Sequence, residues 1–282
     1  MKIVLLGTGG PRPDPKRMGP STLVNIGEVN IIIDAGRGVA TRIVQAGAPI
    51  TNVDYVFITH LHFDHVGGLA DLLFAAWNQG RNKTIMVYGP RGTKDMMSHL
   101  FEAHSKDIWY RLRETALTHQ KLGDIRGLVE VKEVEPGAVS DLGEWMVSAQ
   151  YVSHGHGLGL SQRDWPCLAY RVTSDGVSVV FSGGAVFSPD LVDFSSNASV
   201  LVLCCYLAGS EVIDDDAKLI SRHVLNSSLD AGRIAAEANV GKLVLNHIRE
   251  KSDELLEGMV ADVKRDYNGV VFLGSDLLEI PL

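Results

Sequence analysis

Short runs of apolar residues, each bounded by glycine, proline or polar turn residues, recur along the chain and predict β-strands. Several of these runs are rich in β-branched residues, which is typical of strands buried on both faces. The predicted strands span residues 2–7, 21–27, 29–36, 53–60, 83–89, 144–152, 167–174, 177–184, 199–206, 241–248 and 269–274.

Apolar residues with helical spacing between these strands predict the helices Val39–Ala46, Gly67–Asn78, Thr93–His104, Leu225–Asn239 and Ser252–Tyr267. Helices alternate with strands near the start and in the second half, whereas the strands after residue 128 mostly follow one another. This order favours a mixed α/β class with two sheets over a single doubly wound sheet. The chain has neither a linker-like stretch nor an evident repeat, so we expect a single domain over residues 1–282.

The segment of residues 96–123 crowds aromatic and basic side chains together. Two interpretations remain open. One is an exposed helix and loop that pack a single apolar stripe; the other is a lid over a pocket, because long connections in compact domains are often functional. The residues concerned are His99, Phe101, His104, Trp109, Tyr110, Arg111 and Arg113.

The composition is that of an ordinary globular protein, since 45% of the 282 residues are hydrophobic and 21% are charged. The formal net charge of −8 repels polyanions, which excludes a generally basic nucleic-acid-binding protein but not a local basic patch. No stretch approaches the ~20 apolar residues of a membrane span, and the first apolar run is too short for a signal sequence.

Three cysteines, Cys167, Cys204 and Cys205, make an odd count without the spacing of a metal site. Adjacent cysteines rarely pair with each other, so we expect reduced thiols in a cytoplasmic protein. Cys204 and Cys205 could lie near a functional site, although buried thiols that pack as small apolar groups are the commoner case.

The stretch THLHFDHVGG at residues 59–68 concentrates the chemistry of the chain. His60 and His62 follow an apolar run at positions i and i+2, so strand geometry points both side chains to the same face. Asp64 and His65 follow in the turn before two glycines. Imidazole and carboxylate groups are ligands of zinc and similar divalent ions, and such a cluster is costly to assemble unless a metal ion neutralises it. The stretch therefore predicts a metal site.

With this HxHxDH pattern the sequence resembles the metallo-β-lactamase superfamily. The stretches LLGTGGPRPDP, IIIDAG and MVYGPRGT are similar to its ribonuclease Z and arylsulfatase-like branch, as are VSHGHG and SRHVLNSSLDAGRIAAEANVGKLVLNHI. The resemblance covers nearly the whole chain and is specific for fold and metal, but not for substrate. It implies a four-layer αββα sandwich of two mixed sheets with outer helices.

The resemblance also implies a ligand set for one or two Zn²⁺ ions, with Mn²⁺ or Fe as alternatives. Each half of the set would leave a place for water, as in a catalytic site. Asp34 is interpreted either as a carboxylate that orients a ligand histidine or as a turn-forming residue. One ion would be held by His60, His62 and His154, and the other by Asp64, His65 and His247.

The sequence departs from the family pattern at Gly184. Relatives carry an aspartate there that bridges the two ions, in a stretch like SGDT, whereas this chain has FSGGAVFSPD. Without that carboxylate the repulsion between two dications is less well offset, so we expect one occupied site or a weakened second site. His156 could take over as a ligand. A mono-metal hydrolase, a relative that only binds a ligand and an introduced inactivating change all remain open.

By resemblance, the catalytic groups are Asp64, which would orient a metal-activated water or accept its proton, and His223, which would stabilise or protonate the developing charge. The alternative for His223 is a solvated histidine at a helix start.

The predicted reaction is hydrolysis of a small, partly aromatic ester, lactone, sulfate or phosphodiester, because aromatic side chains are expected around the mouth of the site. They are Phe74, Trp77, Phe101, Trp109 and Trp165. A tRNA 3′-processing endonuclease is the weaker alternative, since the chain is acidic and shows no glycine- and basic-rich arm. The expected partner is thus a small molecule and not nucleic acid or membrane, and the expected assembly is a homodimer, which is common among relatives.

Overall fold

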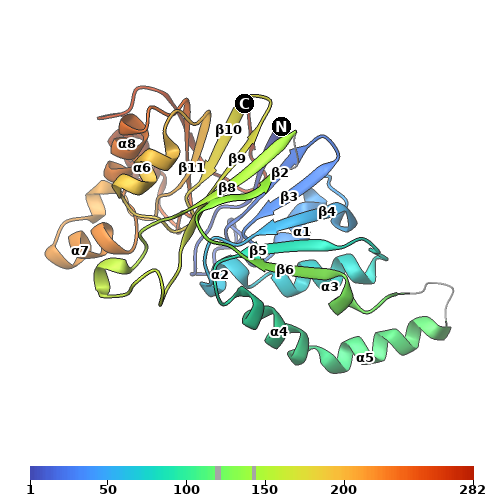
Figure 1. The fold of residues 1–282 in the computed structure, drawn as a ribbon. Coiled ribbons are helices and arrows are strands. Elements are labelled where there is room, and N and C mark those ends of the chain that lie inside the picture. The colour runs from blue at the N-terminus through green and yellow to red at the C-terminus, as the bar shows by residue number, and fades with distance from the viewer. Residues whose placement is uncertain (118–121, 142–143) are drawn as a thin grey trace.

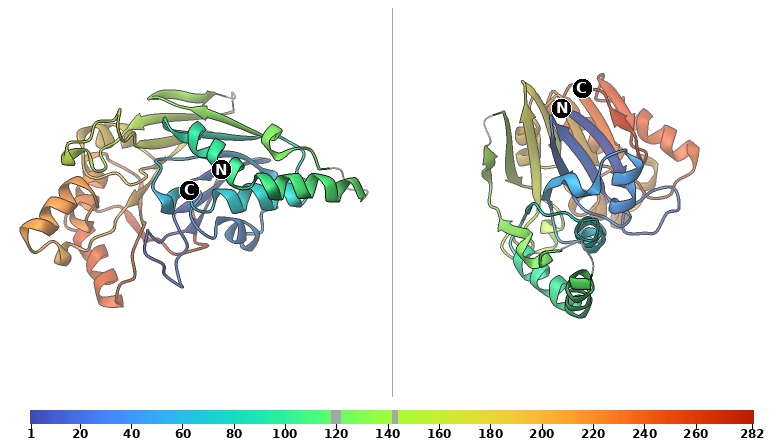
Figure 2. Two further views of the ribbon diagram at one scale, coloured as in Figure 1. Left: turned by 90° about the horizontal axis from the view of Figure 1, so that it is seen from below. Right: turned by 90° about the vertical axis from the view of Figure 1, so that its right-hand side faces the viewer.

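The computed structural model describes residues 1–117, 122–141 and 144–282. Its strands form two seven-stranded sheets that pack face to face, and helices cover the outer side of each sheet (Figures 1 and 2). This arrangement confirms the predicted four-layer αββα sandwich.

The first sheet has the strand order β14-β1-β2-β3-β4-β5-β6. Strands β1 to β3 are antiparallel neighbours, whereas β3 to β6 run parallel. Ile3 of β1 pairs with Ile280 of β14, which brings the two ends of the chain together. The strands are β1 (Lys2–Gly7), β2 (Ser21–Ile26), β3 (Val29–Ile33), β4 (Val53–Phe57), β5 (Ile85–Gly89), β6 (Val129–Glu133) and β14 (Glu279–Ile280).

The second sheet has the order β13-β12-β11-β10-β9-β8-β7. Strands β7 to β10 are antiparallel and β10 to β13 are parallel, so each sheet is mixed. The strands are β7 (Gly137–Asp141), β8 (Trp145–Tyr151), β9 (Leu168–Ser174), β10 (Val177–Phe181), β11 (Val200–Cys204), β12 (Lys242–Asn246) and β13 (Val270–Leu273).

Helices α1, α3, α4 and α5 follow strands of the first sheet, whereas α6, α7, α8 and α9 belong to the half of the chain that forms the second. Figure 1 shows α6 and α8 on one side of the molecule and α1 and α3 on the other. Their bounds are α1 (Val39–Gln45), α2 (Phe63–Val66), α3 (Leu69–Asn78), α4 (Thr93–Ala103), α5 (Ser105–Glu114), α6 (Pro189–Ser195), α7 (Asp215–His223), α8 (Ser228–Glu237) and α9 (Asp253–Val263).

Three apolar clusters hold the layers together. The cluster between the sheets includes Phe57 and Tyr170, whose rings meet edge to face at 5.2 Å. A second cluster fills the space under α1 and α3, and a third the space under α6, α8 and α9. Because most strands bury both faces, they read as continuous apolar runs, which is why the sequence predicted them.

The predicted helix Leu225–Asn239 starts too early. The side chain of Ser227 caps α8 by accepting a hydrogen bond from the backbone N–H of Asp230, so the helix begins at Ser228. The sequence prediction also missed β6, β7, β14, α2, α5, α6 and α7. No helix in the described part of the chain is long and apolar enough to cross a membrane.

The segment predicted as a possible lid forms α4 and α5, and residues 118–121 of it lie outside the described residues. Helix α5 buries Ile108, while Trp109 and Tyr110 on its outer side are 56% and 58% exposed. In Figure 1, α5 extends away from α2 along the edge of the molecule. Closure over the site stays a prediction.

Candidate metal centre

The six predicted ligands lie where three strands end. His60 and His62 follow β4, and Asp64 and His65 occupy the first turns of α2. His154 follows β8 of the other sheet, and His247 follows β12. The sandwich therefore brings together side chains that are up to 187 residues apart, at one edge of both sheets.

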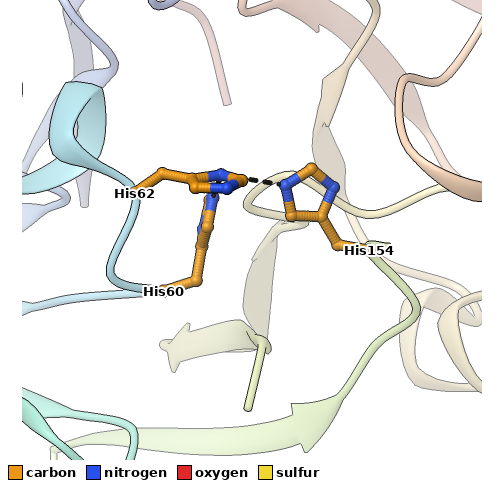
Figure 3. A group of neighbouring side chains, drawn as sticks. All are labelled: His60, His62 and His154. Atoms are coloured by element: carbon orange, nitrogen blue, oxygen red, sulfur yellow. Dashed lines mark hydrogen bonds between the residues drawn. The ribbon is translucent and has the colours of Figure 1, made fainter. Parts of the chain in front are cut away.

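The first group consists of His60, His62 and His154 (Figure 3). Nδ1 of His62 lies 3.0 Å from Nε2 of His60 and 3.1 Å from Nε2 of His154. Three ring nitrogens thus point toward one another from loops that follow strands of two different sheets.

For His154 and His60, hydrogen bonds outside the group decide which ring nitrogen is left for a ligand. Nδ1 of His154 donates to the carbonyl oxygen of Val224 at 2.8 Å, so the lone pair of that ring is on Nε2. Nδ1 of His60 lies 2.9 Å from Oγ1 of Thr59, which leaves its Nε2 facing the group. Burial, together with the charges of neighbouring imidazoles, lowers the pKa of all three histidines, for His154 to about 3. The rings are therefore neutral at physiological pH, which is the form that binds a metal ion.

The second group consists of Asp64, His65 and His247. Nε2 of His247 lies 3.2 Å from Oδ2 of Asp64 and 3.2 Å from Nε2 of His65. Burial acts to raise the pKa of Asp64, but the hydrogen bond from His247 and the charge of His65 lower it to about 2. Asp64 is therefore an ionised, acceptor-only carboxylate at neutral pH.

Asp34 orients this second group, as one of its two interpretations proposed. Its Oδ2 accepts a hydrogen bond from Nδ1 of His65 at 2.8 Å, which leaves Nε2 of His65 for a ligand. Thr59 in turn donates its backbone N–H to Oδ1 of Asp34 at 2.8 Å. Burial opposes the charged form of His65, but the carboxylates of Asp34 and Asp64 raise its pKa.

Two of these residues hold left-handed backbone conformations that glycine usually adopts. Asp34 has φ 57° and His247 has φ 59°. Such strain is commonly stored at functional sites, where the surrounding structure enforces it. Backbone hydrogen bonds hold the chain at both positions. The N–H of Asp34 donates to the carbonyl of Phe57, and the N–H of Ile248, next to His247, donates to the carbonyl of Thr8.

The two groups share a wall, since the rings of His60 and His65 lie 4.0 Å apart between centroids. Gly184 lies beside the first group, since a Cβ atom there would lie 2.9 Å from Nε2 of His154. Glycine at position 184 offers no carboxylate as a metal ligand. His156 cannot replace it, because its Nδ1 accepts from the backbone N–H of His154 and its Nε2 donates to the carbonyl of Trp165.

The three cysteines are free and buried. Burial raises the pKa of Cys204 to about 12 and that of Cys205 well above its ordinary value. Cys204 lines a small cavity together with His65 and His247, but it does not belong to either group of ligands among the described residues.

The expectation that Trp77 lies at the mouth of the site is wrong. Trp77 is 1% exposed and donates its indole N–H to the carbonyl of Gly123. Phe74 packs against Trp77 and against Phe101 of α4, and these two phenylalanines are partly buried against the core cluster under α1 and α3. The spacing of three residues between Phe74 and Trp77 predicted that both lie on one face of a helix, but it did not show whether that face is buried.

Trp165 does lie at the site, with its ring 4.7 Å from that of His62. Phe63, between two predicted ligands, was overlooked in the sequence and is 66% exposed. Its place inside the HxHxDH stretch was the available signal. Trp109 lies on the outer side of α5.

His223 is the last residue of α7 and is not the histidine of a helix start that the sequence suggested. Its ring packs against Gly157, where a Cβ atom would lie 1.8 Å from Nδ1 of His223. The carbonyl of His223 accepts a hydrogen bond from Gly155 N–H at 2.6 Å. His223 therefore borders the loop that carries His154, and its catalytic role stays a prediction.

The donor set fits divalent metal ions. The lone pairs of His154 and His65 are directed into their groups by bonds on the far side of each ring, and several imidazole lone pairs that converge repel one another unless a cation lies between them. Imidazole nitrogens and carboxylate oxygens are ligands of zinc and similar divalent ions. Fold and site together define a metal-dependent hydrolase.

Comparison with known proteins gives the family. A model described as beta-lactamase superfamily domain matches residues 29–248, and the chain belongs to the metallo-β-lactamase superfamily. A ribonuclease Z of Mycobacterium marinum is 30% identical over 287 residues, which cover 98% of this chain and 97% of that protein. A ribonuclease Z of Mycolicibacterium gilvum is 31% identical over 253 residues, which cover 88% and 84%.

Two solved structures show the same fold. The metallo-beta-lactamase fold protein YhfI from Bacillus subtilis superimposes with a TM-score of 0.74 at 20% identity, over 99% of this chain and 98% of that one. The short form of human tRNase Z superimposes with a TM-score of 0.71 at 22% identity, over 100% and 99%. At these identities the likeness concerns the fold alone.

Proposed function

We propose that this hydrolase cleaves a phosphodiester bond near the 3′ end of an RNA, as in tRNA 3′ processing. The observation that carries the proposal is a loop that passes over the predicted ligand His247 at Gly10 and carries two exposed cations, Arg12 and Lys16. Support also comes from the ribonuclease Z relatives, which match nearly the full length of the chain. This proposal reverses the order given by the sequence, which favoured hydrolysis of a small molecule over tRNA 3′ processing.

The loop is held in place by specific contacts. A Cβ atom at Gly10 would lie 2.9 Å from Cε1 of His247, so the backbone passes directly over that ring. Arg37 donates to the carbonyl oxygens of Gly10 and Arg12 at 2.8 and 3.0 Å. The net charge of −8 argued against RNA, but it is a whole-chain sum, and phosphate contacts need only local cations.

The residues of the proposed metal centre have distinct roles. His60, His62 and His154 would hold one metal ion, and Asp64, His65 and His247 another, with zinc as the ion that best suits this nitrogen-rich set. A bound ion supplies Lewis acidity and lowers the pKa of water. Asp64, ionised at neutral pH, accepts a proton or a hydrogen bond from the attacking water. His223, beside the His154 loop, protonates the leaving oxygen.

A second candidate is hydrolysis of a small aromatic ester, lactone, sulfate or phosphodiester. The specific observation in its favour is Trp165, whose ring lies 4.7 Å from that of His62 and offers a flat apolar wall at the site. The third candidate is a protein that only binds a ligand, without hydrolysis. It is supported by Gly184, which has no carboxylate where relatives carry a bridging aspartate. We further propose a cytoplasmic homodimer.

The test is to incubate the zinc-loaded protein with a 3′-extended precursor tRNA and, separately, with bis(p-nitrophenyl) phosphate. We expect endonucleolytic release of the 3′ trailer, lost in His60→Ala and reduced at least about tenfold in kcat by His223→Ala without loss of zinc. Arg12→Ala with Lys16→Ala should raise KM for RNA but not for the small diester, whereas Lys83→Ala serves as a remote control. Turnover of the small diester alone would reject the RNA proposal.

A further inference from the structure

A small cavity lies beneath the second group of ligands, where the apolar layer between the sheets ends. Its volume is about 30 Å³, and every lining residue except Gly183 is buried. Ile33, Phe181 and Val202 contribute apolar lining, whereas Asp34, Asn246 and His247 bring polar side chains. The cavity therefore has both apolar and polar lining, and two predicted metal ligands, His65 and His247, contribute to it.

Two residues that line this cavity each carry a buried polar atom without a hydrogen-bond partner in the described part of the chain. The atoms are Oδ1 of Asn246 and Nδ1 of His247. Asn246 ends β12 and follows Val244 at the spacing that returns a side chain to the same face, so it points into the layer between the sheets. A buried polar atom without a partner is costly, and native proteins rarely leave one in that state.

The two atoms have complementary requirements. Nε2 of His247 faces Asp64 and His65, so when that nitrogen binds a metal ion the proton of the neutral ring is on Nδ1, which must donate. Oδ1 of Asn246 can only accept. A molecule that satisfies both must accept one hydrogen bond and donate another, which neither a bare cation nor a simple anion can do. Water does both, and a space of about 30 Å³ holds roughly two water molecules.

We propose that this cavity is a water site and that Asn246 is a positioning residue for His247. Ordered water accepts from Nδ1–H of His247 and donates to Oδ1 of Asn246, and so fixes the tautomer that leaves Nε2 free for the metal ion. Asp34 performs this task for His65 directly, and Val224 performs it for His154. His247 has no direct partner at Nδ1, and its ring is also the one on a left-handed backbone. The inference concerns the metal centre and does not depend on the substrate.

Asn246→Leu tests the proposal, because it keeps the size of the side chain and removes the acceptor. Zinc affinity, measured by competition with a chelator, should fall about 10- to 100-fold. In ¹⁵N NMR spectra of the zinc-loaded protein, His247 should be protonated at Nδ1 in the unmodified chain, and this signal should weaken in the variant. Asn246→Thr, which keeps an acceptor, should restore most of the affinity. Val244→Ala, two residues earlier on the same face, is the control for lost packing and should leave affinity unchanged.

A second readout needs no metal. In the metal-free protein Nε2 of His247 donates to Asp64, so a bridging water donates both to Nδ1 of His247 and to Oδ1 of Asn246. Asn246→Leu then breaks the bridge and lowers the Tm of the metal-free protein by about 2–4 °C. If the cavity is dry, the same change removes an unsatisfied acceptor and adds apolar contact, so the Tm rises. A raised Tm together with a zinc affinity equal to that of Val244→Ala would overturn the proposal.

Discussion

Gly184 leaves only its backbone against the ring of His154, and a Cβ atom at position 184 would lie 2.9 Å from the Nε2 atom that faces the three-histidine group. A side chain there therefore acts on that group in two ways, by contact with His154 and by whatever ligand it carries. Gly184→Asp adds a carboxylate beside His154, and by resemblance to the family pattern that carboxylate would offset the repulsion between two dications. We predict about one tightly bound zinc per chain for the present sequence and about two for Gly184→Asp, measured by elemental analysis after gel filtration.

Gly184→Ala is the matched control for this change. It adds the Cβ contact with His154 without the carboxylate, and His154 is held from behind by its bond to the carbonyl of Val224. The alanine variant should therefore bind zinc more weakly than the glycine protein. Two tightly bound ions in the unmodified chain would contradict the prediction, because the missing carboxylate would then be of no consequence.

Asp34 orients the ring of His65, so replacing Asp34 should weaken metal binding without removing a ligand. In Asp34→Asn the amide keeps the shape but loses the charge, and its NH₂ group can face Nδ1 of His65 and favour the wrong tautomer. We predict a zinc affinity lower by about 10- to 100-fold and a metal-free protein less stable by about 1–3 kcal/mol, because Asp34 is buried and also accepts from Thr59. Chelator competition and urea unfolding measure the two quantities. An unchanged affinity would show that His65 is oriented by other contacts.

The buried cysteines should be unreactive while the protein is folded. Burial raises the pKa of Cys204 to about 12 and raises those of Cys167 and Cys205 as well, so almost no thiolate exists at pH 8. We predict that Ellman's reagent reacts with the native protein at least about a hundredfold more slowly than with the protein in guanidinium chloride, where three thiols react. Fast reaction of one thiol in the native state would place that cysteine in an open environment.

The sequence predicted most of the fold because its central strands are buried on both faces. Runs such as Lys2–Gly7 and Val200–Cys204 carry a signal that needs no tertiary information. The edge strands β6 and β7 were missed because they bury little: in β6 charged residues alternate with partly buried valines. Helix α7 was missed because it buries little beyond Ser221 and has no wide apolar stripe.

The site was predictable as a set of residue types but not as a network of contacts. His60, His62, Asp64 and His65 are close in sequence, and His154 and His247 joined them only through resemblance to a family. The acceptor for His154 is a backbone carbonyl 70 residues away, which has no sequence signature. The interpretation of His156 as a substitute ligand failed for the same reason, since backbone partners occupy both of its ring nitrogens.

Trp165 and Trp109 together test whether α5 closes over the site. Trp165 lies against His62, whereas Trp109 lies on the outer side of α5 with 56% of its surface exposed. Stacking of an aromatic or nucleobase group on Trp165 contributes about 1–3 kcal/mol, so Trp165→Ala should raise KM at least about fivefold and change kcat little. Trp109→Ala should change neither constant if α5 remains extended as in Figure 1. An equal rise in KM for both variants would instead show that α5 closes over the bound substrate, which is what the lid interpretation of residues 96–123 predicts.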